Sequence, residues 1–158
     1  MPRKKTKSLQ RTINPDRKFD SVLVQRLINK LMKDGKKLKA ERIVYDAFDE
    51  IERRIKQPAV EVYEQALRNV SPQVEVKSRR VGGANYQIPY EVKGSRQVHL
   101  ALMWMVQALR KKKGKPMHIL LANEIVDAYN ETGETFKKKE DAHKMAEANR
   151  AFAHLARF

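Results

Sequence analysis

Residues 95–109 read SRQVHLALMWMVQAL and carry apolar side chains on every side of a helical turn. Gln97 to Leu109 is the longest stretch of the chain without a charged residue. Ser95, just before it, is a residue type that caps helix N-termini. A helix that is apolar all round has to be buried among other elements. The stretch therefore predicts a central helix, capped by Ser95, around which the rest of the chain packs.

Three amphipathic segments precede this helix, with apolar residues at helical spacing between Asp20 and Val70. Asp20 is expected to cap the first, and Gly35 to end it. The second is expected to end before Pro58, which starts the third. The connections are short, which favours neighbouring helices packed as a bundle.

Between the third segment and the central helix, the apolar period changes from 3.6 to 2. Alternating residues flank Gly82-Gly83 on both sides, which predicts a β-hairpin over about residues 73–92. We expect Arg79 and Arg80 at the neck of this ribbon and the two glycines at its tip. A lone two-stranded ribbon is marginally stable in water, so its base should pack on the helices or a partner should order it.

After the central helix, Pro116 can occupy the first turn of a fifth helix, and a last helix is expected from about Glu134 through Ala153. The fold class is therefore mainly α: about six helices in a bundle-like single domain, residues 19–158, with one protruding hairpin. Residues 1–18 hold seven basic residues and one acid with little to bury, and should form a basic arm that is flexible in the absence of a polyanion.

The charge balance points to a polyanionic partner. The chain has 158 residues, with 34 Lys and Arg against 19 Asp and Glu, a formal net charge of +15. Cysteine is absent, which excludes disulfide frameworks, Cys-rich zinc modules and thiol nucleophiles. No segment is long and apolar enough to span a membrane, and no secretory signal is expected.

The basic residues fall into clusters. Arg79-Arg80 beside the glycines can grip phosphates and stack on bases, although an ordinary turn explains the glycines equally well. Cations around Gly35 partly solvate a helix end, and those after Leu109 also complement a helix dipole. The candidate nucleic-acid contacts are Arg3, Lys4, Lys5, Lys7, Arg11, Lys36, Lys37, Lys77, Arg79, Arg80, Gly82, Gly83, Arg96, Arg110, Lys111, Lys112 and Lys113.

Catalytic chemistry finds little support. The four histidines are scattered, no HExxH motif occurs, and no triad or carboxylate pair stands out. We assign no catalytic residue, no metal site and no cofactor. Two rivals remain open: an architectural DNA-binding protein with a basic ribbon, which usually carries an apolar wedge near the tip, and an RNA-modifying enzyme, which would need a pocket of convergent titratable groups.

Three tracts occur in order along the chain: Met32-Lys33-Asp34-Gly35-Lys36-Lys37 with Ala40, then Arg79-Arg80-Val81-Gly82-Gly83-Ala84-Asn85-Tyr86-Gln87 with Pro89, and His143-Lys144-Met145-Ala146-Glu147-Ala148-Asn149, with Trp104 between the last two. Together they resemble the family of bacterial-type small-subunit ribosomal protein seven. The similarity runs from about Asp20 to His154. Met103 and Tyr90 depart from the family pattern, where Arg and an aliphatic residue are common.

The resemblance implies a non-enzymatic, monomeric component of the ribosome that binds the 3′ major domain of 16S ribosomal RNA and organises assembly of the small-subunit head. It implies RNA contacts at Lys36, Lys37, Arg79 and Arg80. It also implies that exit-site transfer RNA, the messenger path, small-subunit protein eleven and other head proteins lie nearby. The expected place is a ribosome of the cytoplasm, or of a plastid.

Overall fold

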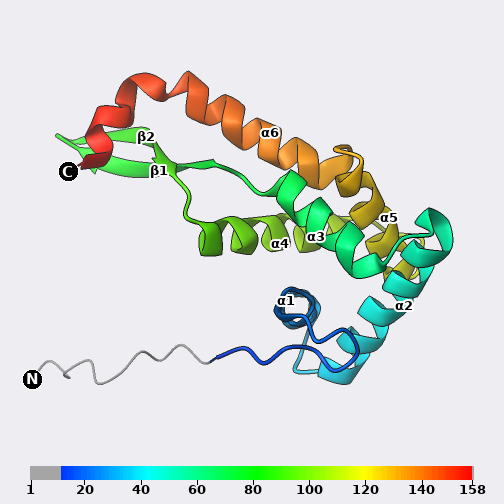
Figure 1. Ribbon diagram of the computed structural model, residues 1–158. Helices are drawn as coiled ribbons and strands as arrows, with labels where there is room; N and C mark the ends of the chain where they lie inside the picture. Colours follow the sequence, from blue (N-terminus) through cyan, green and yellow to red (C-terminus); the bar gives the residue numbers. More distant parts are fainter. Residues whose placement is uncertain (1–11, 158) are drawn as a thin grey trace, which may run out of the picture.

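A computed structural model describes residues 12–157 of the chain. In chain order its elements are α1 (Val22–Leu31), α2 (Lys37–Ile55), α3 (Ala59–Val70), β1 (Val74–Val81), β2 (Ala84–Glu91), α4 (Gly94–Lys111), α5 (Met117–Tyr129), α6 (Gly133–Ala148) and the 3₁₀ helix η1 (Arg150–Arg157). Figure 1 shows a helical body from which the hairpin projects, with α6 running from α5 out to the hairpin. The mainly α fold class with one hairpin is confirmed.

The first helix begins differently from the prediction. Asp20 does not cap it: the N-cap is Ser21, whose hydroxyl accepts the Val24 N–H at 3.5 Å. Asp20 instead takes a left-handed conformation with φ of 50° in the entry turn, which aspartate tolerates. The turn is closed by Asp16, which is almost fully buried and accepts the backbone N–H groups of Lys18, Phe19 and Ser21 at 2.9–3.0 Å. The folded body therefore includes residues that the sequence assigned to the arm.

The core is continuous through α1 to α5. Buried apolar residues from all five helices form one cluster, with Phe48 and Tyr63 among its largest members. Their rings lie 5.5 Å apart, and the Tyr63 hydroxyl donates to the Leu23 carbonyl at 3.2 Å, so the ring is held at both ends. Burial raises the pKa of Tyr63 far above its usual value.

The central helix is placed as predicted, but its start is not. α4 contacts α1, α3, α5 and α6, and its buried residues include Leu100, Met105 and Leu109. Ser95 does not cap it, because the helix begins at Gly94 after Lys93 in extended conformation, with no side-chain cap. The other predicted helices of the body are confirmed to within a few residues of their bounds.

The hairpin is antiparallel, with Val74 opposite Glu91 at its base and Val81 opposite Ala84 at its end. Gly82 and Gly83 form the two-residue turn with φ of 57° and 91°, the left-handed backbone that such a turn requires. Arg80 therefore lies opposite Asn85 and Arg79 opposite Tyr86. The expectation that these arginines lie at the neck of the ribbon is wrong, because the tight turn places them at its outer end.

The last predicted helix divides in two. α6 ends at Ala148, and residues 150–157 form η1, which returns to pack on β2. The Phe152 and Tyr86 rings are 5.2 Å apart, so η1 braces the ribbon near its outer end, as Figure 1 shows. At the base, the Gln73 N–H donates to Nε2 of His143 at 3.1 Å. The ribbon is thus attached to α6 at its root and to η1 further out.

Candidate nucleic-acid interface

The outer end of the hairpin presents unpaired arginines beside an open backbone. Arg79, Arg80, Gly82 and Gly83 are all exposed, and neither arginine forms an ion pair with any residue between 12 and 157. A Cβ atom built on either glycine would meet nothing within 4 Å. Space would thus allow a side chain at either position, and it is the positive φ of the turn that favours glycine. The absence of side chains leaves the peptide groups accessible to a ligand.

The root of the hairpin holds an internal ion pair instead. The Glu75 carboxylate binds Lys77 at 2.8 Å and Arg96 at 3.1 Å, which ties the first turn of α4 to β1. Burial alone would raise the pKa of Glu75, but the hydrogen bonds and charges of the two cations outweigh it and lower the pKa. Lys77 and Arg96 are exposed on their outer sides, yet part of their charge is already neutralised within the protein.

Two cation clusters that are separate in the sequence meet in one hollow. Lys33, Lys36 and Lys39 come from the α1–α2 connection and the start of α2, and Arg110 and Lys112 from the C-terminal end of α4. Together they surround a cavity of about 680 Å³ whose remaining lining is Asp34 and apolar residues such as Met32 and Leu109. We call this the basic hollow. Lys33 and Lys39 belong to the cation cluster that the sequence places around Gly35, although they are absent from the candidate contacts, and the structure adds Arg110 and Lys112 from α4 to that cluster.

Lys112 differs from its neighbours because its ammonium is bound internally. It lies 2.6 Å from Glu124, whose side chain is completely buried, while 28% of the Lys112 side chain is exposed. Glu124 also accepts the backbone N–H of Thr135 at 3.0 Å and the Thr135 hydroxyl. Burial would lower the pKa of Lys112, but the bond to Glu124 and its negative charge raise it above the usual value. Lys111 and Lys113, on either side of Lys112, are both exposed and form no such bond among the described residues.

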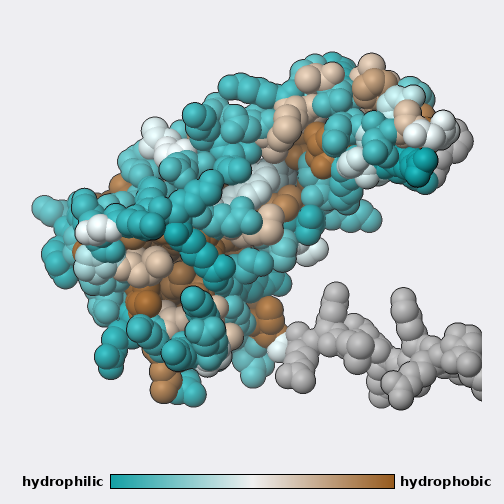
Figure 2. Space-filling view, turned by 180° about the vertical axis from the view of Figure 1, so that it is seen from behind, coloured by the Kyte–Doolittle hydropathy of each residue, from teal (hydrophilic) through white to brown (hydrophobic). Residues whose placement is uncertain are grey.

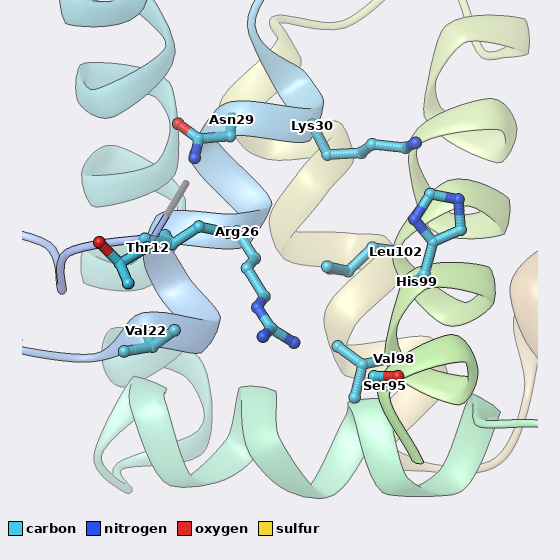
Figure 3. Close-up of a pocket in the computed structure, with 10 residues that line it drawn as sticks. Thr12, Val22, Arg26, Asn29, Lys30, Ser95, Val98, His99 and Leu102 are labelled. Carbon is cyan, nitrogen blue, oxygen red and sulfur yellow. The ribbon is translucent and has the colours of Figure 1, made fainter. Parts of the chain in front are cut away.

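A second groove, between α1 and α4, was not expected from the sequence. Figure 3 shows Arg26 and Lys30 of α1 extending toward α4, where His99 and Ser95 face them. The groove has a volume of about 710 Å³, and Thr12 and Ile13 contribute to its lining. Arg26 and Lys30 are four residues apart on a polar helix face, a spacing that by itself indicates only a solvated surface.

The pKa of His99 is lowered by its surroundings in this α1–α4 groove. Partial desolvation lowers the pKa of His99, and the charges of Lys30 and Arg96 lower it further. A phosphate in the groove would reverse the electrostatic part of that shift, because an anion favours the imidazolium form. The groove therefore has a positive potential near His99, which favours anions over cations.

The remaining predicted residues are placed as follows. Lys36 lines the basic hollow and is exposed. Lys37 is the first residue of α2 and lies 3.7 Å from Glu41. Arg3, Lys4, Lys5, Lys7 and Arg11 lie outside the described residues. Among residues 12–157, no three His, Asp or Glu side chains are arranged to hold a metal ion, and no helix is long and apolar enough to cross a membrane.

Figure 2, seen from behind, shows that hydrophilic residues cover most of this face, with apolar residues gathered in patches over the body. A basic molecule with a projecting ribbon and cation-lined hollows has the features of the class of nucleic-acid-binding proteins. The model of the family described as "Ribosomal protein S7p/S5e" matches residues 2–150. The chain therefore belongs to this ribosomal protein family, as its three sequence tracts indicated.

Curated relatives agree over nearly the whole chain. The "Small ribosomal subunit protein uS7" of Chloroflexus aggregans is 57% identical over 148 residues, covering 94% of both chains. That of Roseiflexus sp. is 55% identical over 159 residues and covers both chains completely. That of Thermotoga maritima is 57% identical over 145 residues, 92% of this chain and 94% of its own. The predicted class, a structural constituent of the small subunit of a bacterial-type cytoplasmic ribosome, is confirmed.

Proposed function

We propose that this protein binds 16S ribosomal RNA directly, in its 3′ major domain, and organises assembly of the small-subunit head. The observation that supports this most is the basic hollow, where Lys33, Lys36, Lys39 and Arg110 converge around one lining acid, Asp34, while the fifth cation, Lys112, is already paired with Glu124. Clustering of like charges costs free energy in the isolated protein, and an RNA backbone would remove that cost. The exposed Arg79 and Arg80 extend the same positive character to the end of the ribbon.

Binding would proceed by electrostatic docking followed by recognition of shape. Lysines and arginines displace counter-ions from the RNA backbone, which provides affinity without sequence preference. Base edges are hidden in the deep groove of an A-form helix, so specificity requires a rigid surface that matches a folded RNA. The helical body supplies such a surface, and the η1-braced ribbon can enter a groove at a fixed angle to it.

Filter binding at several salt concentrations tests the proposal. If six to ten phosphates are engaged, affinity for the 3′ major domain should fall by roughly 10³ to 10⁵ between about 50 and 200 mM salt. Combining Lys36→Ala with Arg110→Ala should lower the log–log salt slope by about one for each phosphate that the variant no longer neutralises. Arg53→Ala, on an exposed part of α2 outside the hollow, is the control.

Competition with duplex DNA separates this function from an architectural DNA-binding protein. The ribbon ends in Gly82-Gly83 between Val81 and Ala84, which offers no large apolar wedge for a DNA step. Duplex DNA should therefore displace the ribosomal RNA only in large excess. Equal competition by both nucleic acids would refute the proposal.

The finer assignments belong to the same proposal. We place exit-site transfer RNA and messenger RNA near the ribbon and α6, and protein eleven and other head proteins at the surface of a monomeric chain. We also propose that the protein catalyses no reaction. Sedimentation with small subunits at low and high salt, followed by cross-linking from the ribbon, tests the partners.

A further inference from the structure

A groove between α4 and α6 is separate from the basic hollow and from the α1–α4 groove. In Figure 1, α6 lies across the central helices, with α4 below it. The groove has a volume of about 520 Å³. It is lined by Trp104 of α4 and by Lys138, Asp141, Ala142, Lys144 and Met145 of α6.

Trp104 has an indole ring with no polar or aromatic partner inside the described chain. It is half-buried, and it takes part in none of the aromatic or cation–π contacts formed by residues 12–157. Its N–H donates to no protein acceptor there, although no buried side-chain polar atom is left unsatisfied. The N–H therefore faces solvent. Beside it, 55% of Met145 is exposed, which is unusual for a large apolar side chain in this protein.

The cations of the groove are also unpaired. Lys138 and Lys144 are exposed, and neither forms an ion pair with another residue in the range 12–157. Their neighbour Lys139 differs, because its ammonium donates to the Asn69 carbonyl at 2.7 Å and lies over the Phe136 ring. Asp141 is the only acid in the lining. The groove thus combines a half-buried indole without an aromatic partner, an exposed methionine and more cations than acids.

We propose that the α4–α6 groove binds an unpaired RNA nucleotide, with its base stacked on Trp104 and its phosphates beside Lys138 and Lys144. Aromatic side chains with adjacent cations are the means by which proteins hold single-stranded nucleic acid, because every base has a face that can stack. A purely electrostatic patch would not require a half-buried indole with a solvent-facing N–H beside an exposed methionine. This inference rests on the proposed function, since it assumes that the protein binds RNA.

The experiment uses Trp104 itself as the probe, because it is the only tryptophan in the chain. The full chain is titrated with oligouridylate and oligoadenylate of about six nucleotides, and tryptophan emission is recorded. Saturable quenching by both oligonucleotides is expected. Inorganic tripolyphosphate, which carries charge but no base, should leave the emission nearly unchanged.

Surface variants test the two lysines without removing the probe. Lys138→Ala combined with Lys144→Ala should raise the midpoint of quenching about tenfold and lower the log–log salt slope by about 1.4, which corresponds to two single-strand phosphate contacts. Asp141→Asn should lower the midpoint. The charge-matched control combines Arg53→Ala with Lys56→Gly, since both residues are exposed on or next to α2 and Lys56 has a φ of 58° that glycine adopts freely. It should leave the midpoint unchanged.

Two outcomes would overturn the inference, and a parallel measurement separates it from the proposed function. If tripolyphosphate quenches the tryptophan emission as strongly as the oligonucleotides do, the groove binds phosphate groups without stacking a base. If the lysine pair and the control give the same midpoint, the phosphates lie elsewhere. Filter binding of the 16S fragment runs alongside: unchanged tryptophan emission with bound fragment refutes the groove only, and absence of binding refutes the proposed function as well.

Discussion

Replacing Lys112 by alanine should destabilise the protein strongly, while replacing its neighbour Lys113 should not. The two lysines are adjacent in a basic run, but only Lys112 forms a 2.6 Å ion pair with the completely buried Glu124. Lys112→Ala leaves that carboxylate in the protein interior without a counter-charge. Lys113 is exposed, so its loss removes only a solvated charge.

The magnitude follows from the burial of the two partners. Removing one partner of a buried ion pair costs about 3–5 kcal/mol. Glu124 keeps two hydrogen bonds from Thr135, and water reaches part of Lys112, so the lower end of that range, about 3 kcal/mol, applies here. For a chain of this size, that corresponds to a fall in Tm of roughly 6–12 °C. Lys113→Ala should change the free energy of unfolding by less than about 0.5 kcal/mol.

Urea and thermal unfolding, followed by circular dichroism, measure both variants. A double-mutant cycle with Glu124→Gln adds a direct readout of the pair, because the cost of Lys112→Ala should shrink when the buried charge is already absent. The raised pKa of Lys112 also gives a pH signature. The stability contributed by the pair is fully present below the usual lysine pKa of about 10.4 and is lost as pH rises through the raised value.

Equal unfolding midpoints for Lys112→Ala and Lys113→Ala would refute the reasoning. So would strict additivity in the cycle, since it would show that Glu124 does not depend on Lys112. Either result would return Lys112 to the group of surface cations available to RNA.

Three further outcomes are expected. Arg79→Ala with Arg80→Ala should weaken binding of the 3′ major domain about tenfold or more while shifting Tm by less than about 2 °C, as measured by filter binding and thermal melts; unchanged affinity would remove the hairpin end from the interface. Phe152→Ala should accelerate amide exchange in the outer half of the ribbon without affecting the helical body, because the variant lacks the ring that packs on Tyr86. Equal exchange rates in the ribbon of the variant and of the unmodified protein would show that η1 does not support the ribbon. Burial and Lys139 lower the pKa of His143, so its contribution to stability is present above about pH 6.5 and declines as pH falls through the folded value; pH-dependent amide exchange at the base of the ribbon should disappear in His143→Ala.

Local patterns predicted the elements of this fold well. Helical spacing located the helices, and the change of period around Gly82-Gly83 located the hairpin, because both signals depend on residues close in sequence. Helix starts were harder. Asp20 and Ser95 are both good capping types, yet the Asp16 carboxylate rearranges the turn before α1, and α4 begins directly from the extended end of the hairpin.

The residue types of the site could be predicted from the sequence, but not which of these residues lie together in the folded protein. The arginines beside the glycines were recognisable from sequence, and a two-residue turn would have placed them at the outer end. The meeting of the Gly35 connection with the end of α4 required the packed helices, as did the role of Lys112, since Glu124 is twelve residues further along the chain. The fold of η1 back onto β2 likewise depends on a distant ring, Tyr86.

The position of η1 has a consequence for the order of events during synthesis. The ribbon leaves the translating ribosome well before residues 150–157, because three helices lie between them in the chain. A nascent protein therefore passes through a stage in which the helices can pack but the projection still lacks its outer support. A chain released at that stage would still have the His143 contact at the root of the ribbon but would lack the Phe152 contact near its outer end.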